Sequence, residues 1–374
     1  MKIAIPLETA DFEHRVAAFP ETVKKFIALK EIVCVEKSAG QKSDIRDDDY
    51  QNAGALIGED FEKTVKDADL ILKINAPDEK ELSCMKKGAV LIAQINALTD
   101  KETVNRIARA GLTCFALELI PRISRAQSMD ILSSQMNLAG YKAVIDAVAV
   151  YKRVMPLMMT AAGTLPAARV LVLGAGVAGL QAIATAKRLG AVVYAFDVRA
   201  AVKEQVESLG AKFVVVDENA DADAGTGYAK ETSDEYKKKQ AEAIAAQIKK
   251  ADIVITTALI PGKKAPVLVS AEMVKSMRAG SVIFDLATKS GGNVEGSVYN
   301  ETVEKDGVTI LGYADEPSRL AADASFLFAK NVFNFASLLI DKETGNYNPD
   351  FDDEILKGCC IVKDGVIVHP LLKE

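Results

Sequence analysis

The chain has 374 residues, of which 49% are hydrophobic, and this supplies apolar cores for two or three globular domains. Its net charge of −6 disfavours nucleic acid as a partner, because an acidic chain is repelled by phosphate polyanions. The five cysteines are odd in number and form no CxxC pair, so neither a metal site nor a disulfide framework is expected.

The first third of the chain alternates short apolar runs with amphipathic stretches. Strands are expected at residues 2–6, 32–37, 69–74, 89–95 and 113–119, and helices at 21–30, 61–68 and 101–111. Strands that alternate with helices predict a parallel sheet covered on both faces. The N-terminus lacks the apolar segment of a signal peptide and no run predicts a membrane span, so we expect a cytoplasmic chain.

The pattern becomes helical from residue 126 to about 159, which predicts a long connecting helix before the interruptions at Pro156 and Pro166. A second alternating series begins at Arg169 and runs through about six strands, the pattern of a doubly wound domain. Another long helix is expected over residues 316–342. The tail then predicts a β-hairpin that turns at Asp364-Gly365 and packs against the first domain.

These patterns predict an α/β protein with two doubly wound, Rossmann-like parallel-sheet domains that flank a cleft and are joined by long helices. We expect the first domain to comprise residues 1–125 and 340–374. The second should comprise residues 126–325, its connecting helix included, and residues 326–339 should form a return helix.

The segment VLVLGAGVAG carries the spacing Gly174-x-Gly176-x-x-Gly179 between a predicted strand and a predicted helix. The first glycine permits a tight turn, the second lets the backbone approach a pyrophosphate, and the third packs the helix on the strand. Asp197 ends the next strand, where a carboxylate accepts from the adenosine ribose and repels a 2′-phosphate. The motif predicts one NAD site in the second domain, at the carboxyl ends of its strands. Two alternatives remain: the neighbouring Arg199 suits NADP, and a glycine turn can serve packing alone.

The stretch RISRAQSMD, residues 122–130, lies between a predicted strand and the long helix, and it has two interpretations of equal weight. In the first, Ser124 and Gln127 form a capping box and Asp130 complements the helix dipole. In the second, Arg122, Gln127 and Asp130 contact a nicotinamide amide and riboses at the mouth of the cleft.

The polar segment DAGTGYAK carries one aromatic residue, Tyr228, and is either a surface loop or a lid over the nucleotide. A dehydrogenase that acts on an alcohol or an amino acid must also move a proton, and Lys73 at the end of a predicted strand is a candidate base. Near it the sequence offers Gln94 and Asn96 and no histidine. Hydride transfer between two nicotinamides needs no proton transfer, so a site of amides, an arginine and an aspartate suits that reaction.

Four segments carry a family resemblance: PRISRAQSMDILSSQMNLAGYKAVIDA, MMTAAGTLPAARVLVLGAGVAGLQAIATAKRLGAVVYAFDVRAAVKEQVESLGAKF, ITTALIPGKKAPVLV and VIFDLATKSGGN. They resemble domain I, the NAD(H)-binding component of proton-translocating nicotinamide nucleotide transhydrogenases, and the similarity runs nearly end to end. It implies that Arg122, Gln127, Asp130 and Ser133 belong to the loop region at the hydride-transfer site. It also implies that Tyr228 lies on the family's mobile loop.

Two features depart from the family pattern. Gln94-Ile95 stands where members often have His-Leu, and the stretch after Gly292 is not distinctive. Neither departure touches the glycine motif or residues 122–133.

The resemblance implies an oxidoreductase that transfers hydride directly between NAD(H) on this chain and NADP(H) on a partner subunit, coupled to proton translocation by a separate integral-membrane proton-channel subunit. It also implies a homodimer that is cytoplasmic and peripheral to the inner membrane through its partner subunits. Besides the catalytic candidates Arg122, Gln127, Asp130, Ser133 and Tyr228, we expect cofactor contacts from Ile123, Ser124, Arg125, Gly174, Gly176, Val177, Ala178, Gly179, Asp197, Val198, Arg199, Gly227, Ala258 and Leu259.

Alanine dehydrogenase is the related alternative, because it shares the architecture, the glycine motif and the Lys73 position. The catalytic histidine of that enzyme is absent here, which weighs against it. A non-enzymatic NAD-sensing module is a third interpretation. Such a module needs no hydride-site residues, so the intact stretch 122–130 weighs against it.

Overall fold

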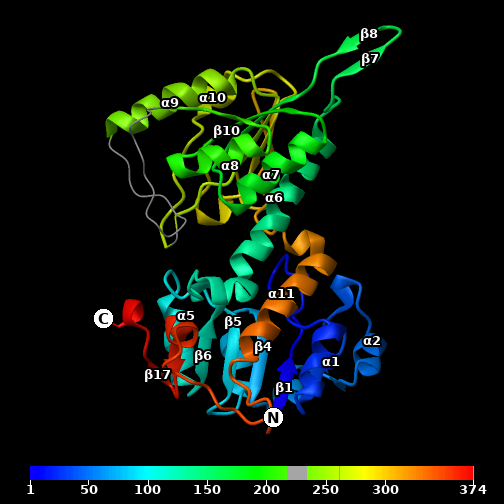
Figure 1. The fold of residues 1–374 in the computed structure, drawn as a ribbon, viewed down its shortest axis with the longest axis vertical. Coiled ribbons are helices and arrows are strands. Elements are labelled where there is room, and N and C mark those ends of the chain that lie inside the picture. The colour runs from blue at the N-terminus through cyan, green and yellow to red at the C-terminus, as the bar shows by residue number, and fades with distance from the viewer. Residues whose placement is uncertain (217–233, 261, 374) are drawn as a thin grey trace. The chain divides into compact units, whose positions relative to one another are not determined.

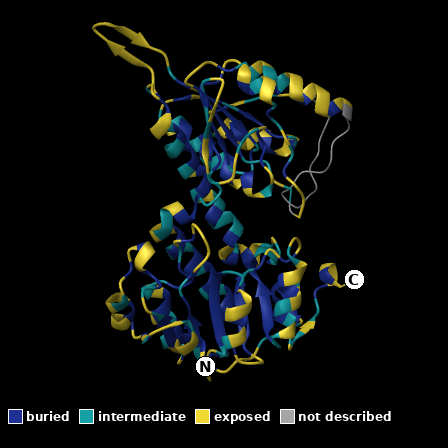
Figure 2. Ribbon diagram, turned by 180° about the vertical axis from the view of Figure 1, so that it is seen from behind, coloured by how far each residue is buried: buried dark blue, intermediate teal, exposed yellow. Residues whose placement is uncertain are grey.

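The computed structural model describes residues 1–216, 234–260 and 262–373 (Figure 1). Contacts divide the chain into two compact units, the first Met1–Gln135 with Ser318–Glu374, the second Met136–Pro317. Each unit is built on its own, mainly parallel sheet, which confirms the predicted α/β class. Figure 2 shows the central strands of both sheets as buried, as expected for sheets covered on both faces.

The first unit has an eight-stranded sheet in the order β17-β16-β6-β5-β4-β1-β2-β3. Its first six strands are mutually parallel. Their spatial order, 3-2-1-4-5-6, is that of a classic doubly wound sheet. Successive side chains alternate between its faces, so that Ile3 and Ile5 join one apolar cluster and Ala4 joins another. These strands are β1 (Lys2–Ile5), β2 (Ile32–Glu36), β3 (Leu56–Gly58), β4 (Leu70–Asn75), β5 (Val90–Gln94) and β6 (Thr113–Ala116).

Short helices follow these strands, and several begin at a capping aspartate. Asp78 shows the local logic, because its carboxylate accepts from the backbone N–H of Glu81 at 2.7 Å and its own N–H donates to the Glu81 carboxylate. The helices of the first unit are α1 (Pro20–Ala28), α2 (Asp47–Asn52), α3 (Phe61–Val65), α4 (Glu79–Cys84), α5 (Lys101–Arg109), α11 (Ala321–Ala336) and α12 (Glu354–Cys359), with 3-10 turns η1 (Gln41–Ser43), η2 (Leu117–Leu119), η3 (Ser124–Met129), η6 (Ser318–Leu320) and η7 (Pro370–Leu372).

The predicted C-terminal hairpin is confirmed. Strands β16 (Cys360–Lys363) and β17 (Val366–Ile367) are antiparallel, and the turn residues Asp364 and Gly365 both have positive φ, 49° and 79°. β16 also pairs antiparallel with β6, so the tail completes the first sheet. All five cysteines are free thiols, four of them buried and Cys84 half-buried.

The second unit has a seven-stranded sheet in the order β11-β10-β9-β12-β13-β15-β14. Six strands are parallel in the same 3-2-1-4-5-6 order, and β14 joins the edge through an antiparallel hairpin. The strands are β9 (Arg169–Leu173), β10 (Val192–Phe196), β11 (Lys212–Phe213), β12 (Ile253–Thr256), β13 (Val282–Asp285), β14 (Thr302–Lys305) and β15 (Val308–Leu311). The helices are α7 (Val177–Arg188), α8 (Lys203–Ser208), α9 (Asp234–Ile248) and α10 (Ala271–Lys275), with 3-10 turns η4 (Ala200–Val202) and η5 (Thr288–Ser290).

Two further features frame the second unit. The long helix predicted from residue 126 forms as α6 (Ile131–Val150), but it begins only after the 3-10 turn η3. The proline-punctuated region beyond it folds into a two-stranded hairpin of β7 (Met158–Thr160) and β8 (Gly163–Leu165) that projects from its unit (Figures 1 and 2). The sequence patterns did not reveal this hairpin. All six strand residues are exposed, Met159 by 83%.

Among the residues that the structure describes, no helix is both long and apolar enough to cross a bilayer. Over the same ranges, no group of histidine, cysteine and acidic side chains could hold a metal ion.

Candidate functional site

The three glycines of the Gly174-x-Gly176-x-x-Gly179 motif occupy three different environments. Gly174 directly follows β9 with a φ of 99°, and a Cβ there would lie 2.6 Å from Thr257 Oγ1. At Gly179 a Cβ would lie 1.9 Å from the Gly174 carbonyl oxygen, so only glycine lets α7 pack this closely. At Gly176 an added Cβ would meet no atom within 4 Å. The turn, the open approach and the close packing predicted from the spacing are all present.

The first turn of α7 offers hydrogen-bond donors where the backbone is open. The first intrahelical bond runs from the Leu180 N–H to the Gly176 carbonyl, so earlier N–H groups such as those of Val177 and Ala178 have no partner within the helix. The positive end of the helix dipole adds to these donors. The open backbone and the first-turn N–H groups that lack a partner within the helix fit a pyrophosphate, the group that the glycine motif predicts.

The Asp197 carboxylate lies directly after β10 and is already hydrogen-bonded. The Ala175 N–H donates to its Oδ2 at 2.7 Å, and the Arg199 N–H donates to its Oδ1 at 2.9 Å. The Arg199 guanidinium donates to both oxygens, at 2.9 Å to Oδ1 and 2.8 Å to Oδ2. Four donors fill the acceptor positions of the carboxylate. A ribose hydroxyl can therefore reach Asp197 only if the Arg199 side chain gives way. Val198, between the two, is half-buried.

The segment after β12 is held to the same turn. Thr257 Oγ1 donates to the Gly174 carbonyl at 3.1 Å. Both backbone polar groups of Ala258 are bonded to the side chain of Asn293, which the sequence analysis did not single out. Both backbone polar groups of Ala258 are therefore already engaged, whereas the Leu259 side chain is exposed. The sequence signal that could have singled out Asn293 is its position directly after Gly291-Gly292, in the loop that follows Asp285 at the end of β13.

The capping box predicted for Ser124 and Gln127 is wrong. Ser124 begins the 3-10 turn η3, and that turn has no side-chain cap. The helix that follows, α6, is capped instead by Asp130, whose Oδ1 accepts from the Ser133 N–H at 2.9 Å while Oδ2 accepts from the Ser133 hydroxyl. Asp130 and Ser133 thus hold each other at the start of α6, because the chain enters the helix six residues later than the box requires.

The 3-10 turn presents polar side chains on a fixed support. Ala126 and Met129 are buried in the core of the first unit, and the side-chain amides of Asn331 and Asn334 donate to the carbonyl of Ser128. The opposite side of the turn is exposed. The polar side chains of η3 are therefore exposed, while the core contacts and the two asparagine bonds fix the backbone of the turn.

Four predicted residues in this turn and directly before it differ in their contacts. Arg125 is exposed and pairs with Asp353 through two hydrogen bonds of 2.6 and 2.9 Å. Arg122 is also exposed, and Ile123 packs against the apolar core. The exposed Gln127 side chain makes no hydrogen bond with any part of the chain that the structure describes. The lid candidate Tyr228, with Gly227, lies outside the described residues.

Lys73 is buried in the first unit rather than presented to a substrate. Its Nζ lies 3.0 Å from Glu81 Oε1 and 3.7 Å from Glu8 Oε2. Glu8 also accepts from the Ile74 N–H at 2.6 Å, and burial raises the pKa of the Glu8 carboxyl despite the nearby lysine. The amino group is therefore engaged by two carboxylates in the interior.

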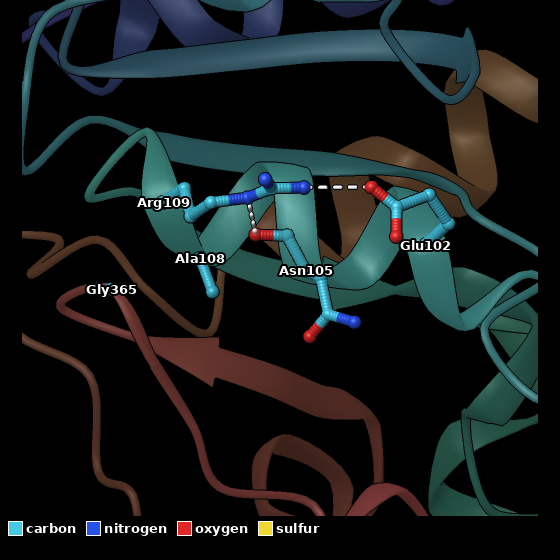
Figure 3. Close-up of a pocket in the computed structure, with 5 residues that line it drawn as sticks. All are labelled: Glu102, Asn105, Ala108, Arg109 and Gly365. Carbon is cyan, nitrogen blue, oxygen red and sulfur yellow. Dashed lines mark hydrogen bonds and ion pairs between the residues drawn. The ribbon is translucent and has the colours of Figure 1, made fainter.

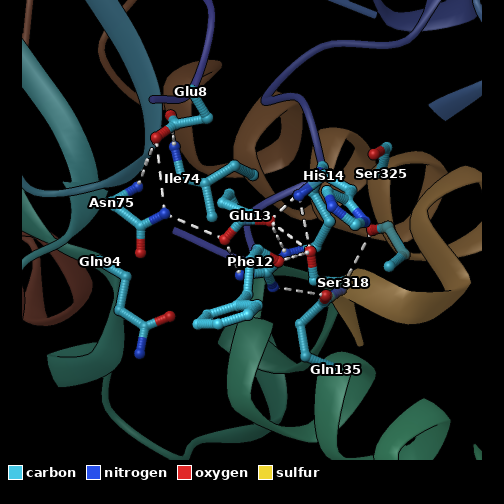
Figure 4. Close-up of polar contacts among 12 residues, drawn as sticks. Glu8, Phe12, Glu13, His14, Ile74, Asn75, Gln94, Gln135, Ser318 and Ser325 are labelled. Atoms are coloured by element: carbon cyan, nitrogen blue, oxygen red, sulfur yellow. Dashed lines mark hydrogen bonds and ion pairs between the residues drawn. The ribbon is translucent and has the colours of Figure 1, made fainter. Parts of the chain in front are cut away.

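A second polar cluster surrounds Glu13 near the carboxyl ends of β1 and β4 (Figure 4). Its carboxylate accepts from the Arg15 guanidinium at 2.7 and 2.8 Å, from the Asn75 amide at 2.9 Å and from the Ser318 hydroxyl at 3.1 Å. Burial alone would raise the pKa of Glu13, but the bonds and charge of Arg15 outweigh it and lower the pKa to about 2. Gln94, also labelled in Figure 4, donates to Asn96 at 3.3 Å, and the His14 N–H donates to the Ser318 hydroxyl at 2.6 Å in the same cluster.

A pocket of about 400 Å³ lies beside α5 and the turn between β16 and β17 (Figure 3). It is lined by Glu102, Asn105, Ala108, Arg109 and Gly365, and Arg109 pairs with Glu102 at 2.7 Å. None of the predicted site residues lines this pocket.

Comparisons with known proteins support the resemblance. Residues 4–139 match the N-terminal domain, and residues 143–370 the C-terminal domain, of the alanine dehydrogenase/PNT family. An NAD(P) transhydrogenase alpha-subunit chain of Rhodospirillum rubrum is 54% identical over 100% of this chain and 99% of that protein. A transhydrogenase structure from Sinorhizobium meliloti is 48% identical, with a TM-score of 0.90 over 98% of this chain and 100% of that chain. Alanine dehydrogenase 1 of Staphylococcus aureus is 30% identical over 91% of this chain and 88% of that protein.

Proposed function

Because this chain belongs to the alanine dehydrogenase/PNT family, we propose that it is the NAD(H)-binding chain of an NAD(P) transhydrogenase. Hydride passes directly between NAD(H) on this chain and NADP(H) on a partner subunit. A separate integral-membrane subunit couples the reaction to proton translocation. The chain itself is a cytoplasmic homodimer that reaches the inner membrane through these partners.

The second unit carries the residues that would hold NAD(H). The open backbone at Gly176 and the first-turn N–H groups of α7 fit the pyrophosphate. Asp197 fits the adenosine ribose once Arg199 gives way. NADH supplies a hydride from its nicotinamide ring, and its transfer to NADP⁺ gives NAD⁺ and NADPH without release or uptake of a proton.

The observation that carries the proposal is that the Gln127 side chain is exposed and forms no hydrogen bond with the described residues. An exposed side chain on a well-anchored turn, with no hydrogen bond inside the described chain, has no evident structural task. Its amide can both donate to and accept from a ribose or a carboxamide. We therefore assign Gln127 to the nucleotide of the partner subunit, and Arg122 and Asp130 to the ring of NAD(H), with Ser133 holding Asp130 in place.

The state of Lys73 disfavours an alanine dehydrogenase activity. Reductive amination needs a group that exchanges a proton with the substrate. Lys73 is buried against Glu81 and Glu8, and Gln94 and Asn96 cannot replace a histidine in that task. We expect no oxidation of NADH with pyruvate and ammonium.

The β7–β8 hairpin supports the homodimer. A two-stranded hairpin is marginally stable in water by itself, and this one exposes Met159 and the adjoining Leu157, the latter by 62%. Exposed apolar side chains on a projecting element indicate a surface that is covered in an assembly. A second copy of this chain is the partner that the family resemblance implies.

Single-turnover hydride transfer after mixing with the NADP(H)-binding component tests the proposal. Gln127→Asn keeps the amide but shortens its reach by one methylene. We expect nearly unchanged NADH affinity and at least a tenfold slower transfer, about 1.4 kcal/mol in the barrier. The matched control is Gln51→Asn, an exposed glutamine on α2, which should leave the rate unchanged.

Two outcomes would contradict the proposal. A wild-type chain that binds NADH but transfers no hydride to the NADP component would instead be an NAD-sensing module. A Gln127→Asn variant with a lower melting temperature and an unaltered rate would show that Gln127 serves the fold alone.

A further inference from the structure

Asp285, the last residue of β13, is a fully buried carboxylate around which the following loop is folded. It accepts from Thr256 Oγ1 at 2.9 Å, from Ser297 Oγ at 2.7 Å and from the backbone N–H groups of Ala287, Asn293 and Val294. These donors come from β12 and from the loop that follows β13. The carboxylate therefore fixes the loop, with Asn293 in it, against the carboxyl end of β12.

Asn293 is also fully buried, and its side chain uses both N–H donors and one acceptor position on two other backbone segments. Its Oδ1 accepts from the Ala258 N–H at 3.0 Å. Its Nδ2 donates to the carbonyls of Ala258 at 2.9 Å and Pro266 at 2.7 Å. One amide thus holds both polar groups of Ala258 and ties this residue to Pro266.

The position of Ala258 in the sheet says which part of a dinucleotide this clamp concerns. In a 3-2-1-4-5-6 sheet the dinucleotide lies across the switch point, one mononucleotide on each side. Asp197, expected at the adenosine ribose, follows β10 on one side of β9. Ala258 follows β12 on the other side, and its neighbour Thr257 is bonded to the Gly174 carbonyl. Ala258 therefore belongs to the nicotinamide side.

We propose that Asn293, anchored on Asp285, is a positioning residue that sets the Ala258 backbone for the nicotinamide half of the cofactor. The inference rests on the proposed function, because it takes NAD(H) as the ligand. The clamp turns the polar groups of Ala258 away from the ligand and leaves its carbon atoms to face the nicotinamide half. A shift of this backbone would misplace the reacting ring while leaving the adenosine half seated.

The test compares the binding of NADH with that of 5′-AMP, a probe of the adenosine half, in the full chain. Asn293→Asp keeps the size and one acceptor but replaces the donor that serves two carbonyls with an oxygen. We expect NADH affinity to fall at least tenfold, AMP affinity to stay within twofold, and single-turnover hydride transfer at saturating NADH to slow further. General loosening of the unit would weaken NADH and AMP alike, so equal losses, or no loss, would overturn the proposal.

Asn300→Asp is the matched control. Asn300 accepts from the Ala314 N–H through Oδ1, while its Nδ2 has no partner among the described residues, so this exchange breaks no clamp. We expect an unchanged ratio of NADH to AMP affinity. If Asn293→Asp does not fold, Thr256→Val removes one donor from Asp285 at nearly constant volume. A smaller shift of the same ratio is then expected, and an unchanged ratio overturns the proposal.

The binding ratio also separates this inference from the proposed function. A wild-type chain that transfers no hydride to the NADP component would refute the transhydrogenase role. The NADH-to-AMP ratio of Asn293→Asp would still report whether Asn293 positions the nicotinamide side.

Discussion

Replacing Asp197 should change the nucleotide preference of the chain through Arg199, and Asp197→Asn tests this with little change in volume. In the structure the carboxylate and the guanidinium neutralise each other, with side chains 7% and 11% exposed. The discrimination against a 2′-phosphate therefore depends on Asp197 keeping Arg199 engaged. The amide of the variant carries no charge and keeps a single acceptor oxygen, so it holds Arg199 less firmly, and an arginine released from its carboxylate partner beside the ribose position is the arrangement that suits NADP.

The structure allows the magnitude to be worked out. Losing a hydrogen bond to a charged acceptor costs NADH about 1.5–3 kcal/mol, and a guanidinium that is released from Asp197 and bonds the 2′-phosphate stabilises bound NADPH by a similar amount. Together these terms shift selectivity by about 3–6 kcal/mol, which is a hundredfold or more in the ratio of dissociation constants. Stability falls separately, because removing one partner of a buried ion pair costs about 3–5 kcal/mol.

Calorimetric titration of wild type and Asp197→Asn with NADH and with NADPH measures the ratio, and a thermal melt shows that both are folded. The companion variant Arg199→Gln retains the Asp197 carboxylate and removes the guanidinium. A ribose hydroxyl can then bond Asp197 without displacing the Arg199 side chain. It should bind NADH at least as tightly as wild type and NADPH more weakly. A ratio that moves by less than threefold in Asp197→Asn would refute the reasoning.

Three further predictions concern other parts of the chain. Gly179→Ala should lower the unfolding free energy by about 3 kcal/mol, because its Cβ meets a carbonyl at 1.9 Å. Gly176→Ala should melt within a few degrees of wild type and bind NADH at least tenfold more weakly. A stable Gly179→Ala variant with weak NADH binding, together with an unstable Gly176→Ala variant, would contradict the assigned roles. The pKa of Glu13, about 2 in the fold against 4.5, stabilises the folded state above pH 4.5, by about 3 kcal/mol, and this is lost as pH falls towards 2. Glu13→Gln should therefore be less stable at pH 7 and approach wild type near pH 2, and a deficit equal at every pH in urea titrations would argue against this. Met159→Asp should shift sedimentation from dimer to monomer, while Leu371→Asp, at another exposed apolar residue outside the hairpin, should not.

The sequence by itself determined the features that depend on neighbours along the chain. The spacing of Gly174, Gly176 and Gly179 specified a turn, an open approach and a close packing, and all three are found in the structure. The Asp364-Gly365 pair specified a hairpin, since these residues accept the positive φ that such a turn requires. The alternation of predicted strands and helices specified two doubly wound sheets, because the hydrophobic periodicity that distinguishes strands from helices is a local property of the chain.

Tertiary structure alone decided which distant polar groups meet. Asn293 binds Ala258, 35 residues away, because β12 and β13 are neighbours in the sheet, and no local pattern marks that pair. Lys73 meets Glu81 and Glu8 because strand order buries all three together, and this removes a candidate base that the sequence left open. Hydrogen bonds of this kind follow from packing, since a buried polar group must take whichever partner the fold brings within reach.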